Sequence, residues 1–549
     1  MPLQKNQVLT LRIERLSSDG SGVAHSPDGE TVFVPGAAPG DEARVRIVKD
    51  CKRYAFGILD EVLTPSPDRI PVDCAVAGPC GGCSLRHLDY AAELRAKQEN
   101  VADAFARIGG LDVPVLPIVG SPEVNRYRNK VQFPVGVDKS GKPCIGFYAG
   151  RTHRIVPCPD CRLQPGVLNE IGNALCAFFA EKGIQPYSEE TGRGLVRHIF
   201  LRRGAHSGQI MVCLVCTRAK LPSAEELCTR LKAQFAEITT ILLNVNAKNT
   251  NVILGTETHT LYGPGYIEDT LCGVPVQLGP LSFYQVNTLA AEQLYGIAAQ
   301  YAQLTPDDLL LDLYCGMGTI GLSMAAHCRE LIGVEIVPEA IESAKANAAR
   351  MGADVAAKSR FFCADAGQAA TRLAAEGLHP DIVMLDPPRK GCDEATLSAV
   401  VRMSPRRVVY VSCNPATAAR DAAWLEQNGY HAEKVQPVDL FPRTRHVETV
   451  VLLSKGEVDS KKIRVEFSLE DMDMSEFQDG ATYPQIKEYV LEHTGLKVSN
   501  LYISQIKRKC GIGVGKNYNL PKSEDSRQPQ CPQEKEKAIR EAFKYFGMI

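Results

Sequence analysis

The chain has 549 residues, of which 44% are hydrophobic and 23% charged, and its formal net charge is −2. This near-neutral balance excludes a protein that binds nucleic acid through its overall charge, and the length predicts several domains, each with its own core. No apolar run reaches the length of a signal peptide or a membrane span, so we expect no membrane partner. The 19 cysteines then favour a reducing, cytoplasmic location, where clustered cysteines bind metals or act in catalysis.

Residues 1–62 alternate short β-type runs with turns rich in glycine and proline. The runs are Val8–Ile13, Thr31–Val34, Glu42–Val48 and Tyr54–Leu59. Short strands at this spacing predict a small β-barrel. The polar stretch Pro65–Asp68 is typical of a linker that ends this domain.

A cysteine cluster follows the linker. Cys74, Cys80 and Cys83 lie close together, and Cys158 and Cys161 follow much later in the chain. Three neighbouring thiols and a distant fourth can ligate either zinc or a cubane iron–sulfur cluster, and the spacing does not choose between them. The two glycines between the second and third cysteines make a set of free core thiols the weaker interpretation.

Residues 63–274 mix strands and helices, which predicts an α+β domain. The segment from Ser121 to Ile155 within it carries seven Lys and Arg residues against two acidic ones. Such a segment can neutralise RNA phosphates, although a solvated surface is an equally good interpretation. Arg126, Arg128 and Lys130 are the candidate RNA-binding residues.

From residue 275 to 455 the pattern changes to strands separated by alanine-rich helices, which predicts a doubly wound, mostly parallel sheet. A glycine-rich turn, Gly316-x-Gly318-x-x-Gly321, follows the predicted strand Leu309–Leu313. The turn lets the backbone approach a ligand closely and by itself suits NAD, FAD or S-adenosylmethionine. Asp312, four residues ahead of the first glycine, favours a methyltransferase loop over a dehydrogenase loop.

Three acidic residues follow further strands of this region. Glu335 ends the run Leu331–Glu335, where it can accept both ribose hydroxyls of a nucleoside cofactor, and Asp365 is placed to accept the adenine amino group. Asp386 begins an Asp-Pro-Pro-Arg sequence. Arg389 occupies the position where amino-directed methyltransferases carry an aromatic residue, which disfavours methylation of an exocyclic amine. Asp386 can instead accept from an imide N–H, the group that uracil presents.

A cysteine and a carboxylate provide what methylation of uracil carbon 5 requires. A thiolate added to carbon 6 makes carbon 5 nucleophilic, and a base must then remove the carbon-5 proton. Cys413 ends a predicted strand directly before Asn-Pro, and this position predicts a lowered thiol pKa. Glu448 precedes the strand Thr449–Leu453 and fits the base. We expect His446 to be a local structural partner.

Four motifs together resemble those of the RNA 5-methyluridine methyltransferase family, and the resemblance covers residues 1–455. The motifs are Ser-Cys-Asn-Pro at 412–415, His-Val-Glu-Thr at 446–449, Asp-Pro-Pro-Arg-Lys-Gly at 386–391 and Ser-Phe-Tyr-Gln-Val-Asn at 282–287. The N-terminal barrel resembles the OB-like TRAM module, which binds RNA through a basic face with aromatic residues. The basic and aromatic candidates on that face are Arg44, Arg46, Lys49, Lys52, Arg53, Tyr54 and Phe56.

The resemblance implies a multidomain α/β protein. Its parts are a TRAM β-barrel (1–62), an α+β central domain with an iron–sulfur cluster (63–274), a Rossmann-like S-adenosylmethionine-dependent methyltransferase domain (275–455) and a small helical extension (456–549). It also implies site residues. Cys413 is the nucleophile, Glu448 the proton acceptor, and Phe283 and Asp386 contact the flipped uracil. The residues implied to bind S-adenosylmethionine are Gln285, Tyr314, Gly316, Gly318, Thr319, Glu335, Asp365 and Asp386.

The ribosomal-RNA branch of the family carries a [4Fe–4S] cluster, which implies Cys74, Cys80, Cys83 and Cys161 as ligands and leaves Cys158 as an alternative fourth. The tRNA branch lacks the barrel and the cysteines. We therefore expect a monomeric enzyme that methylates 23S ribosomal RNA. The alternatives are a tRNA methyltransferase, a non-catalytic RNA chaperone or ribosome-assembly factor, and a dehydrogenase, which has no use for Cys413.

Residues 456–549 lie outside this resemblance. Residues Thr482 to His493 predict an amphipathic helix with Gly495 as its C-cap, and Ser499 predicts the N-cap of a second helix through Lys509. A helix-turn-helix pair that contacts nucleic acid and a small docking module are both consistent with this pattern. Residues 517–533 are predicted to form a polar linker.

Overall fold

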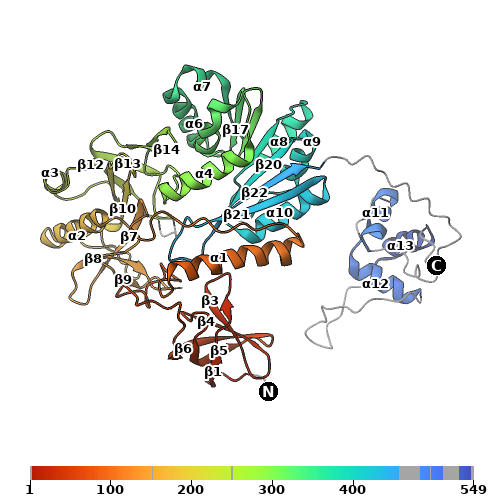
Figure 1. Ribbon diagram of the computed structural model, residues 1–549, viewed down its shortest axis with the longest axis horizontal. Coiled ribbons are helices and arrows are strands. Elements are labelled where there is room, and N and C mark those ends of the chain that lie inside the picture. Colours follow the sequence, from red (N-terminus) through yellow and green to blue (C-terminus); the bar gives the residue numbers. More distant parts are fainter. Residues whose placement is uncertain are drawn as a thin grey trace. The chain divides into compact units, whose positions relative to one another are not determined.

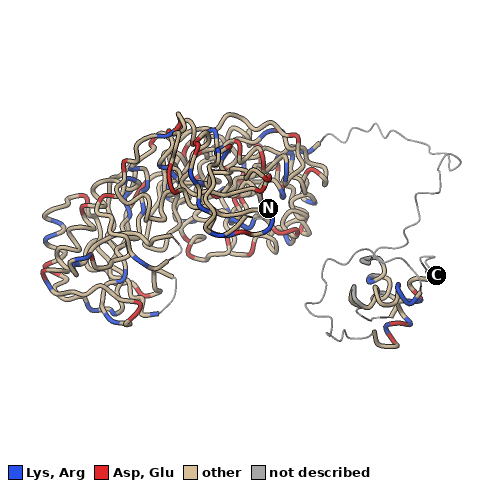
Figure 2. Tube along the Cα trace, turned by 90° about the horizontal axis from the view of Figure 1, so that it is seen from below, with Lys and Arg blue, Asp and Glu red and all other residues tan. Residues whose placement is uncertain are grey.

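The computed structural model describes residues 3–150, 152–248, 252–456, 483–494, 496, 498–510 and 531–545. The chain divides into two compact units, Met1–Val458 and Asp459–Ile549. Lysine and arginine alternate with aspartate and glutamate along the trace of both units, in keeping with the near-neutral composition (Figure 2). Among the described residues, no helix is both long and apolar enough to cross a membrane.

Six short strands form the N-terminal sheet, in the order β1-β5-β6-β4-β3-β2 (Figure 1). Alternate residues of β5 point into the core: Ala43, Val45 and Ile47 are fully buried, whereas Arg44 is exposed. All four predicted strands are confirmed, and two further ones, β2 and β3, join them. The strands are β1 (Val8–Arg12), β2 (Arg15–Leu16), β3 (Ser21–His25), β4 (Thr31–Pro35), β5 (Glu42–Asp50) and β6 (Tyr54–Thr64).

The long helix α1 (Tyr90–Ala104) follows the cysteine segment and continues into a π-helical turn, η1 (Phe105–Gly109). Asp89 caps α1 by accepting from the backbone N–H of Ala92. Val101 and Phe105 pack in the same core cluster as residues of the second large sheet, which is built from residues 309–455. The helix therefore belongs structurally to that sheet, although it precedes the central domain in sequence.

The central domain is a seven-stranded mixed sheet in the order β13-β12-β11-β10-β7-β8-β9, with two helices packed against it. Cys213 and Cys216 are fully buried in β11, so both are core residues. The elements are β7 (Lys130–Val137), β8 (Pro143–Tyr148), β9 (Ile155–Pro157), α2 (Gly166–Glu181), β10 (Val196–Arg203), β11 (Ile210–Cys216), α3 (Ala224–Gln234), β12 (Ile238–Val245) and β13 (Glu257–Tyr262). A separate hairpin of β14 (Ile267–Leu271) and β15 (Val274–Leu278) leads into the next domain.

The second seven-stranded sheet has the order β18-β17-β16-β19-β20-β22-β21. Its first five strands are parallel, and β22 pairs antiparallel with both β20 and β21, so the predicted doubly wound, mostly parallel sheet is confirmed. The strands are β16 (Leu309–Leu313), β17 (Glu330–Glu335), β18 (Ser359–Cys363), β19 (Ile382–Leu385), β20 (Arg407–Ser412), β21 (Tyr430–Val438) and β22 (Glu448–Lys455).

Helices cover both faces of this sheet, which explains its unbroken apolar strands. Neighbouring residues of β16 enter different cores: Leu310 lies in the core that also contains residues of α4, and Leu309 and Leu311 lie in the core that contains residues of α10. The helices are α4 (Thr288–Ala302), α5 (Thr319–Met324), η2 (Ala325–His327), α6 (Pro338–Met351), α7 (Ala353–Lys358), α8 (Ala366–Ala375), α9 (Glu394–Met403) and α10 (Pro415–Gln427).

The C-terminal unit contains α11 (Tyr483–Thr494), α12 (Asn500–Lys509) and α13 (Gln533–Tyr545) around a small core that includes Ile486, Ile503 and Phe543. The first two helices confirm the prediction, and Ser499 caps α12 by accepting from the N–H of Tyr502 at 3.3 Å. The third helix was not predicted. Gly495 and residues 517–530 of the predicted linker lie outside the described residues.

Candidate active site

The glycine loop joins β16 to α5 at the carboxyl end of the parallel strands, where open α/β sheets bind their ligands. Tyr314, Gly316 and Gly318 have positive φ angles of 69°, 55° and 79°. Asp312 lies beneath the loop, and its Oδ2 accepts from the N–H of Gly321 at 3.0 Å. A Cβ on Gly321 would meet that oxygen at 2.8 Å, so only glycine fits there.

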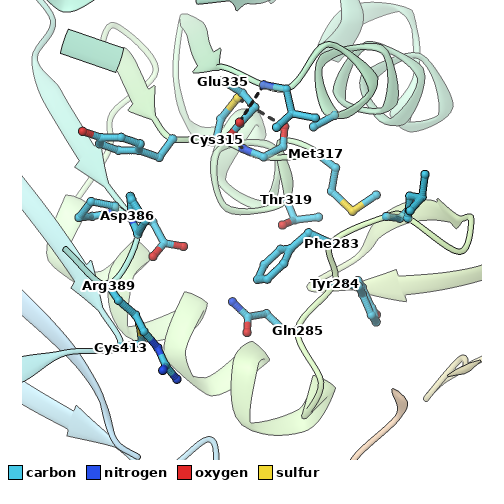
Figure 3. Close-up of a pocket in the computed structure, with 18 of the residues that line it drawn as sticks. Phe283, Tyr284, Gln285, Cys315, Met317, Thr319, Glu335, Asp386, Arg389 and Cys413 are labelled. Carbon is cyan, nitrogen blue, oxygen red and sulfur yellow. Dashed lines mark hydrogen bonds between the residues drawn. The ribbon is translucent and has the colours of Figure 1, made fainter. Parts of the chain in front are cut away.

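Glu335 ends β17 and turns its carboxylate toward this loop (Figure 3). Its Oε2 accepts from the N–H of Gly316 at 3.2 Å, and its Oε1 accepts from the N–H groups of Ile336 and Val337. Asp365 caps α8 by accepting from the N–H of Gln368 at 3.1 Å. Both carboxylates line one large cavity of about 1650 Å³. A dinucleotide-sized or nucleoside-sized cofactor therefore fits between the glycine loop and these strand ends.

The same cavity extends to the predicted nucleophile and base. It is lined by Cys413, Glu448, Asp386 and Arg389. In Figure 3, Arg389 and Cys413 lie side by side and Asp386 points its carboxylate into the cavity. Cys413 follows β20, Asp386 follows β19 and Glu448 begins β22, and these three strands are neighbours in the sheet. The fold thus gathers residues that lie up to 62 positions apart (448 − 386) at one edge.

Three buried carboxyl groups, Glu448 and Asp386 in this cavity and Asp312 beneath the glycine loop, hold their protons more tightly than in water. Burial raises the pKa of Glu448 to about 8, and the Asp386 carboxylate adds to this effect while the Arg389 guanidinium opposes it. Burial also raises the pKa of Asp386 to about 7 and that of Asp312 to about 8. Pockets that hold such shifted groups are typical of catalytic sites.

The prediction of a lowered pKa for the Cys413 thiol is wrong. Asn414 does cap α10, accepting from the N–H of Ala416 at 3.2 Å, and Pro415 occupies the first turn as expected. Burial and the Glu448 carboxylate nevertheless raise the pKa of Cys413, and Arg389 only partly compensates for them. A deprotonating partner or a bound substrate must therefore supply the remaining activation of the thiol.

The opposite wall of the cavity is the loop that connects β15 to α4. Phe283 is 72% exposed and, with Gln285 and Thr319, faces Asp386 across the cavity (Figure 3). The central domain holds this loop in place. Asn129 donates its side-chain N–H to the carbonyl of Gln285 at 2.8 Å, and the buried Arg202 donates to two further carbonyls of the loop.

Most of the predicted site residues line this one cavity. Those that do are Phe283, Gln285, Tyr314, Gly316, Thr319, Glu335, Asp365, Asp386, Cys413 and Glu448. Gly318 does not line it: it precedes α5 in a left-handed conformation and packs toward Leu322 and Phe361. His446 lines the cavity too, and burial lowers its pKa to about 4, so it is neutral at pH 7. Sequence reasoning assigned no catalytic role to Arg389 and missed its effect on both Cys413 and Glu448.

The predicted cluster ligands line a second cavity of about 270 Å³. Cys74, Cys80, Cys83, Cys158 and Cys161 all contribute to it. Within the part of the chain that the structure describes, no group of three or more His, Cys, Asp or Glu side chains is placed to hold a metal ion. The buried Arg86 lines the same cavity, and two of its guanidinium nitrogens, Nε and Nη2, have no hydrogen-bond partner. The thiols thus share a cavity with a buried cation.

The three basic candidates of the central domain have different positions. Arg128 lines both cavities. Lys130 lines only the cysteine cavity, and burial together with Arg202 and Arg128 lowers its pKa to about 8. Arg126 lies 2.7 Å from Asp160 and donates to the carbonyl of Cys161, so it supports the cysteine segment.

On the barrel, two of the candidate cations are neutralised within the chain. Arg44 lies 2.6 Å from Glu61, and Arg46 lies 2.8 Å from Asp60. Three aromatic side chains form a cluster on the predicted surface: the ring centroids of Phe33, Tyr54 and Phe56 lie 5.7–5.8 Å apart. Besides Arg44, four candidate residues of this face are exposed: Tyr54, Lys49, Lys52 and Arg53. This face therefore carries a cluster of aromatic rings beside exposed cations, a combination that suits stacking on RNA bases.

Comparison with known proteins identifies two family models along the chain. Residues 207–456 match the family described as tRNA (Uracil-5-)-methyltransferase, and residues 2–59 match the TRAM domain. An uncharacterized RNA methyltransferase of Halalkalibacterium halodurans is 43% identical over 453 residues, which are 82% of this chain and 98% of that protein. An uncharacterized RNA methyltransferase of Clostridium tetani is 41% identical over 454 residues, 83% of this chain and 98% of that protein.

Among solved structures, the tRNA (uracil-54, C5)-methyltransferase of Pyrococcus abyssi, in complex with S-adenosyl-L-homocysteine, is similar to this chain. It is 27% identical, with a TM-score of 0.65, and the alignment covers 81% of this chain and all of that one. The similarity thus extends beyond the methyltransferase sheet to the preceding domains.

Proposed function

Because the chain belongs to the family of S-adenosylmethionine-dependent RNA (uracil-5-)-methyltransferases, we propose that it forms 5-methyluridine through a covalent bond between Cys413 and the target uracil. The observation that carries this proposal is that Cys413, Glu448 and Asp386 line the same cavity as the glycine loop. A nucleophile, a base and a cofactor loop that share one cavity are what the reaction requires.

The reaction proceeds in three steps. The Cys413 thiolate forms a bond to carbon 6, and the electrons of the carbon 5–carbon 6 double bond move toward the carbon-4 oxygen. S-adenosylmethionine supplies the methyl group, which carbon 5 takes while the cofactor sulfur keeps the bonding electron pair. The Glu448 carboxylate then removes the carbon-5 proton, the double bond re-forms and the thiolate leaves. Asp386 accepts from the uracil imide N–H and so orients the ring, and Arg389 stabilises the thiolate.

The target base must leave its stack to reach this cavity. Phe283 supports the flipped ring, because it is an exposed aromatic side chain on the cavity wall opposite Asp386. Arg128 lies on the same cavity and is a candidate contact for an RNA phosphate. The barrel aromatics would stack on bases that flank the target.

We also propose that Cys74, Cys80, Cys83 and Cys161 hold a [4Fe–4S] cluster. The cysteine cavity supports this, because its thiols face Arg86, whose unpartnered N–H groups suit an anionic cluster. Reconstitution with iron and sulfide should load the protein, and Cys83→Ser should lower its iron content whereas Cys51→Ser should not.

We propose 23S ribosomal RNA as the substrate, since the cysteine set and the TRAM domain are combined as in the ribosomal-RNA branch of the family. The Pyrococcus abyssi enzyme, whose name specifies tRNA uracil-54, favours tRNA as the second candidate. A cytoplasmic location and a monomeric state complete the proposal. Methylation of purified 23S rRNA and of tRNA, each followed by mapping of the modified uridine, decides between the two substrates.

The test of the covalent mechanism uses RNA in which 5-fluorouridine replaces uridine. Fluorine at carbon 5 cannot be removed as a proton, so the enzyme–RNA bond should persist on a denaturing gel in the presence of S-adenosylmethionine. Cys413→Ala should abolish this complex, and Cys51→Ala, which alters a partly exposed thiol of the barrel, should not. Undiminished methylation by Cys413→Ala would falsify the mechanism.

A further inference from the structure

Four charged side chains, Glu93, Lys97, Asp439 and Arg443, are buried together behind the active site. Lys97 is 1% exposed, and its Nζ lies 2.8 Å from Glu93 Oε1 and 2.8 Å from Asp439 Oδ1. Both carboxylates are fully buried, and Arg443 lies 3.7 Å from the second oxygen of Glu93. Buried charges are tolerated in a folded protein only when they are paired. Loss of one partner leaves the others buried without compensation, and this strongly destabilises the folded protein.

This network joins α1 to a segment more than 340 positions away in the sequence. The segment, residues 439–446, connects β21 to β22 and is here called the 439–446 segment. Lys97 donates to the carbonyl of Phe441 at 3.2 Å, and the N–H of Arg443 donates to Glu93 at 2.7 Å. Tyr90 donates its hydroxyl to Asp439 at 2.9 Å. Helix α1 thus holds both the charges and the backbone of the segment.

Three other parts of the chain fix the same backbone. Its carbonyls accept hydrogen bonds from the cysteine segment, the central domain and the start of α4. The donors are Ser84 N–H and Leu85 N–H to Arg443 at 3.1 Å, Tyr127 hydroxyl to Pro442 at 3.0 Å and Asn287 side-chain N–H to Leu440 at 3.0 Å. Arg443 itself has a φ of 69°, a conformation that a non-glycine residue keeps only where its surroundings impose it.

The opposite side of the 439–446 segment faces the large cavity that contains Cys413. Phe441, Thr444, Arg445 and His446 line the large cavity together with Cys413, and Glu448 follows two residues later. The segment therefore has a buried side that is held by ionic contacts and a cavity side that leads directly to the proposed base. Cys413, in contrast, lies between β20 and α10 and belongs to neither α1 nor the 439–446 segment.

We propose that Lys97 is a positioning residue for the proton-abstraction step: it holds the 439–446 segment so that Glu448 faces carbon 5 of the target. This inference rests on the proposed role of Glu448 as the base. The effect of Lys97 is largest on proton abstraction, because that step uses Glu448 as the base, whereas attack by Cys413 requires no proton transfer to Glu448. A displacement of a catalytic group by about 1 Å reduces the rate of the step that it catalyses on the order of 100-fold.

The test separates the two steps in the full-length protein. For Lys97→Met, we expect covalent complex formation on 5-fluorouridine RNA at nearly the normal rate, but turnover of ordinary RNA reduced on the order of 100-fold. The covalent complex should then accumulate on ordinary uridine RNA, because it forms but does not resolve. The denaturing gel used for the trapped complex measures its formation and its accumulation, and incorporation of labelled methyl groups into RNA measures turnover.

Two further variants keep the test decisive if Lys97→Met folds poorly. Tyr90→Phe removes the hydroxyl that donates to Asp439 and accepts from the N–H of Ser121, and it should give the same pattern to a smaller degree. The matched control is Asp308→Asn, which breaks the 2.5 Å ion pair with Arg406 at the amino end of β16, away from the strand ends that carry the site. It should lower the melting temperature without accumulation of the covalent complex.

The positioning role is wrong if Lys97→Met and Tyr90→Phe slow both steps by the same factor or leave both unchanged. It is also wrong if Asp308→Asn accumulates the complex as they do. Methylation that persists in Cys413→Ala refutes instead the proposed function on which this inference rests, so the two failures are distinguishable.

Discussion

The pKa of Glu448 determines how proton abstraction depends on pH. Burial raises this pKa to about 8, assisted by Asp386 and opposed by Arg389. Only the ionised carboxylate accepts a proton, and with this pKa about one tenth of it is ionised at pH 7 and about nine tenths at pH 9. Because a raised carboxyl pKa keeps the base protonated at lower pH, activity must increase with pH. We expect proton removal to accelerate about tenfold between pH 7 and pH 9.

The measurement uses RNA with tritium at carbon 5 of uridine. The covalent complex is allowed to form at pH 7, the pH is then jumped, and tritium release is followed in a single turnover. Formation of the complex on 5-fluorouridine RNA is measured at each pH as a separate control, because ionisation of Cys413 also increases with pH. Arg389→Met should move the midpoint of tritium release to higher pH. Lys390→Met should leave it in place, since Lys390 is not among the groups that shift this pKa.

One result would refute this reasoning. If tritium release after the jump is equally fast at pH 7 and pH 9 while complex formation still increases with pH, the titrating base is not a buried Glu448. A midpoint that does not move in Arg389→Met would contradict the electrostatic argument alone, because the guanidinium would then have no influence on the carboxyl group.

Four other predictions follow from the site and the fold. Glu335→Gln should weaken binding of S-adenosylhomocysteine on the order of ten- to 100-fold by calorimetry, because it loses a charged acceptor; unchanged affinity would contradict the ribose contact. Gly321→Ala should reduce the free energy of unfolding by about 1–3 kcal/mol, since its Cβ meets the Asp312 carboxylate; equal stability in urea titrations would contradict this. Tyr54→Ala should weaken RNA binding by about 1–3 kcal/mol without changing its salt dependence, whereas the paired, exposed Arg44→Ala should have little effect in the same assay. A chain that ends at residue 456 should keep its melting temperature, because the second compact unit has its own core; a large decrease would contradict the independence of the two units.

Local patterns were sufficient to predict the family, and most of the predicted site residues line one cavity. The glycine turn, Cys413 before Asn-Pro and Glu448 before a strand are each defined by a few consecutive residues. The same holds for the strands β16 and β19, whose unbroken apolar runs reflect burial on both faces of a parallel sheet. The domain boundaries at residues 62, 274 and 455 remain predictions, because Met1–Val458 forms one compact unit.

The electrostatic state of the site could not be predicted in this way. The position of Cys413 at a helix start predicted a lowered pKa, but burial and the carboxylate of Glu448 raise it. Likewise, Arg44 and Arg46 counted as RNA-binding cations until the pairing of β5 with β6 placed them beside Glu61 and Asp60. The field at a group depends on neighbours from other strands, which composition does not reveal.

The sequence alone therefore determined the family to which this chain belongs, since the proposed reactive groups and the cofactor turn lie in short contiguous motifs. Only the tertiary structure decided how those groups are held. The order of strands in the sheet brings β19, β20 and β22 together, and the packing of α1 places Lys97 beside Asp439, 342 positions away. Hydrophobic periodicity specifies which face of an element is buried, but it does not specify which distant element covers that face.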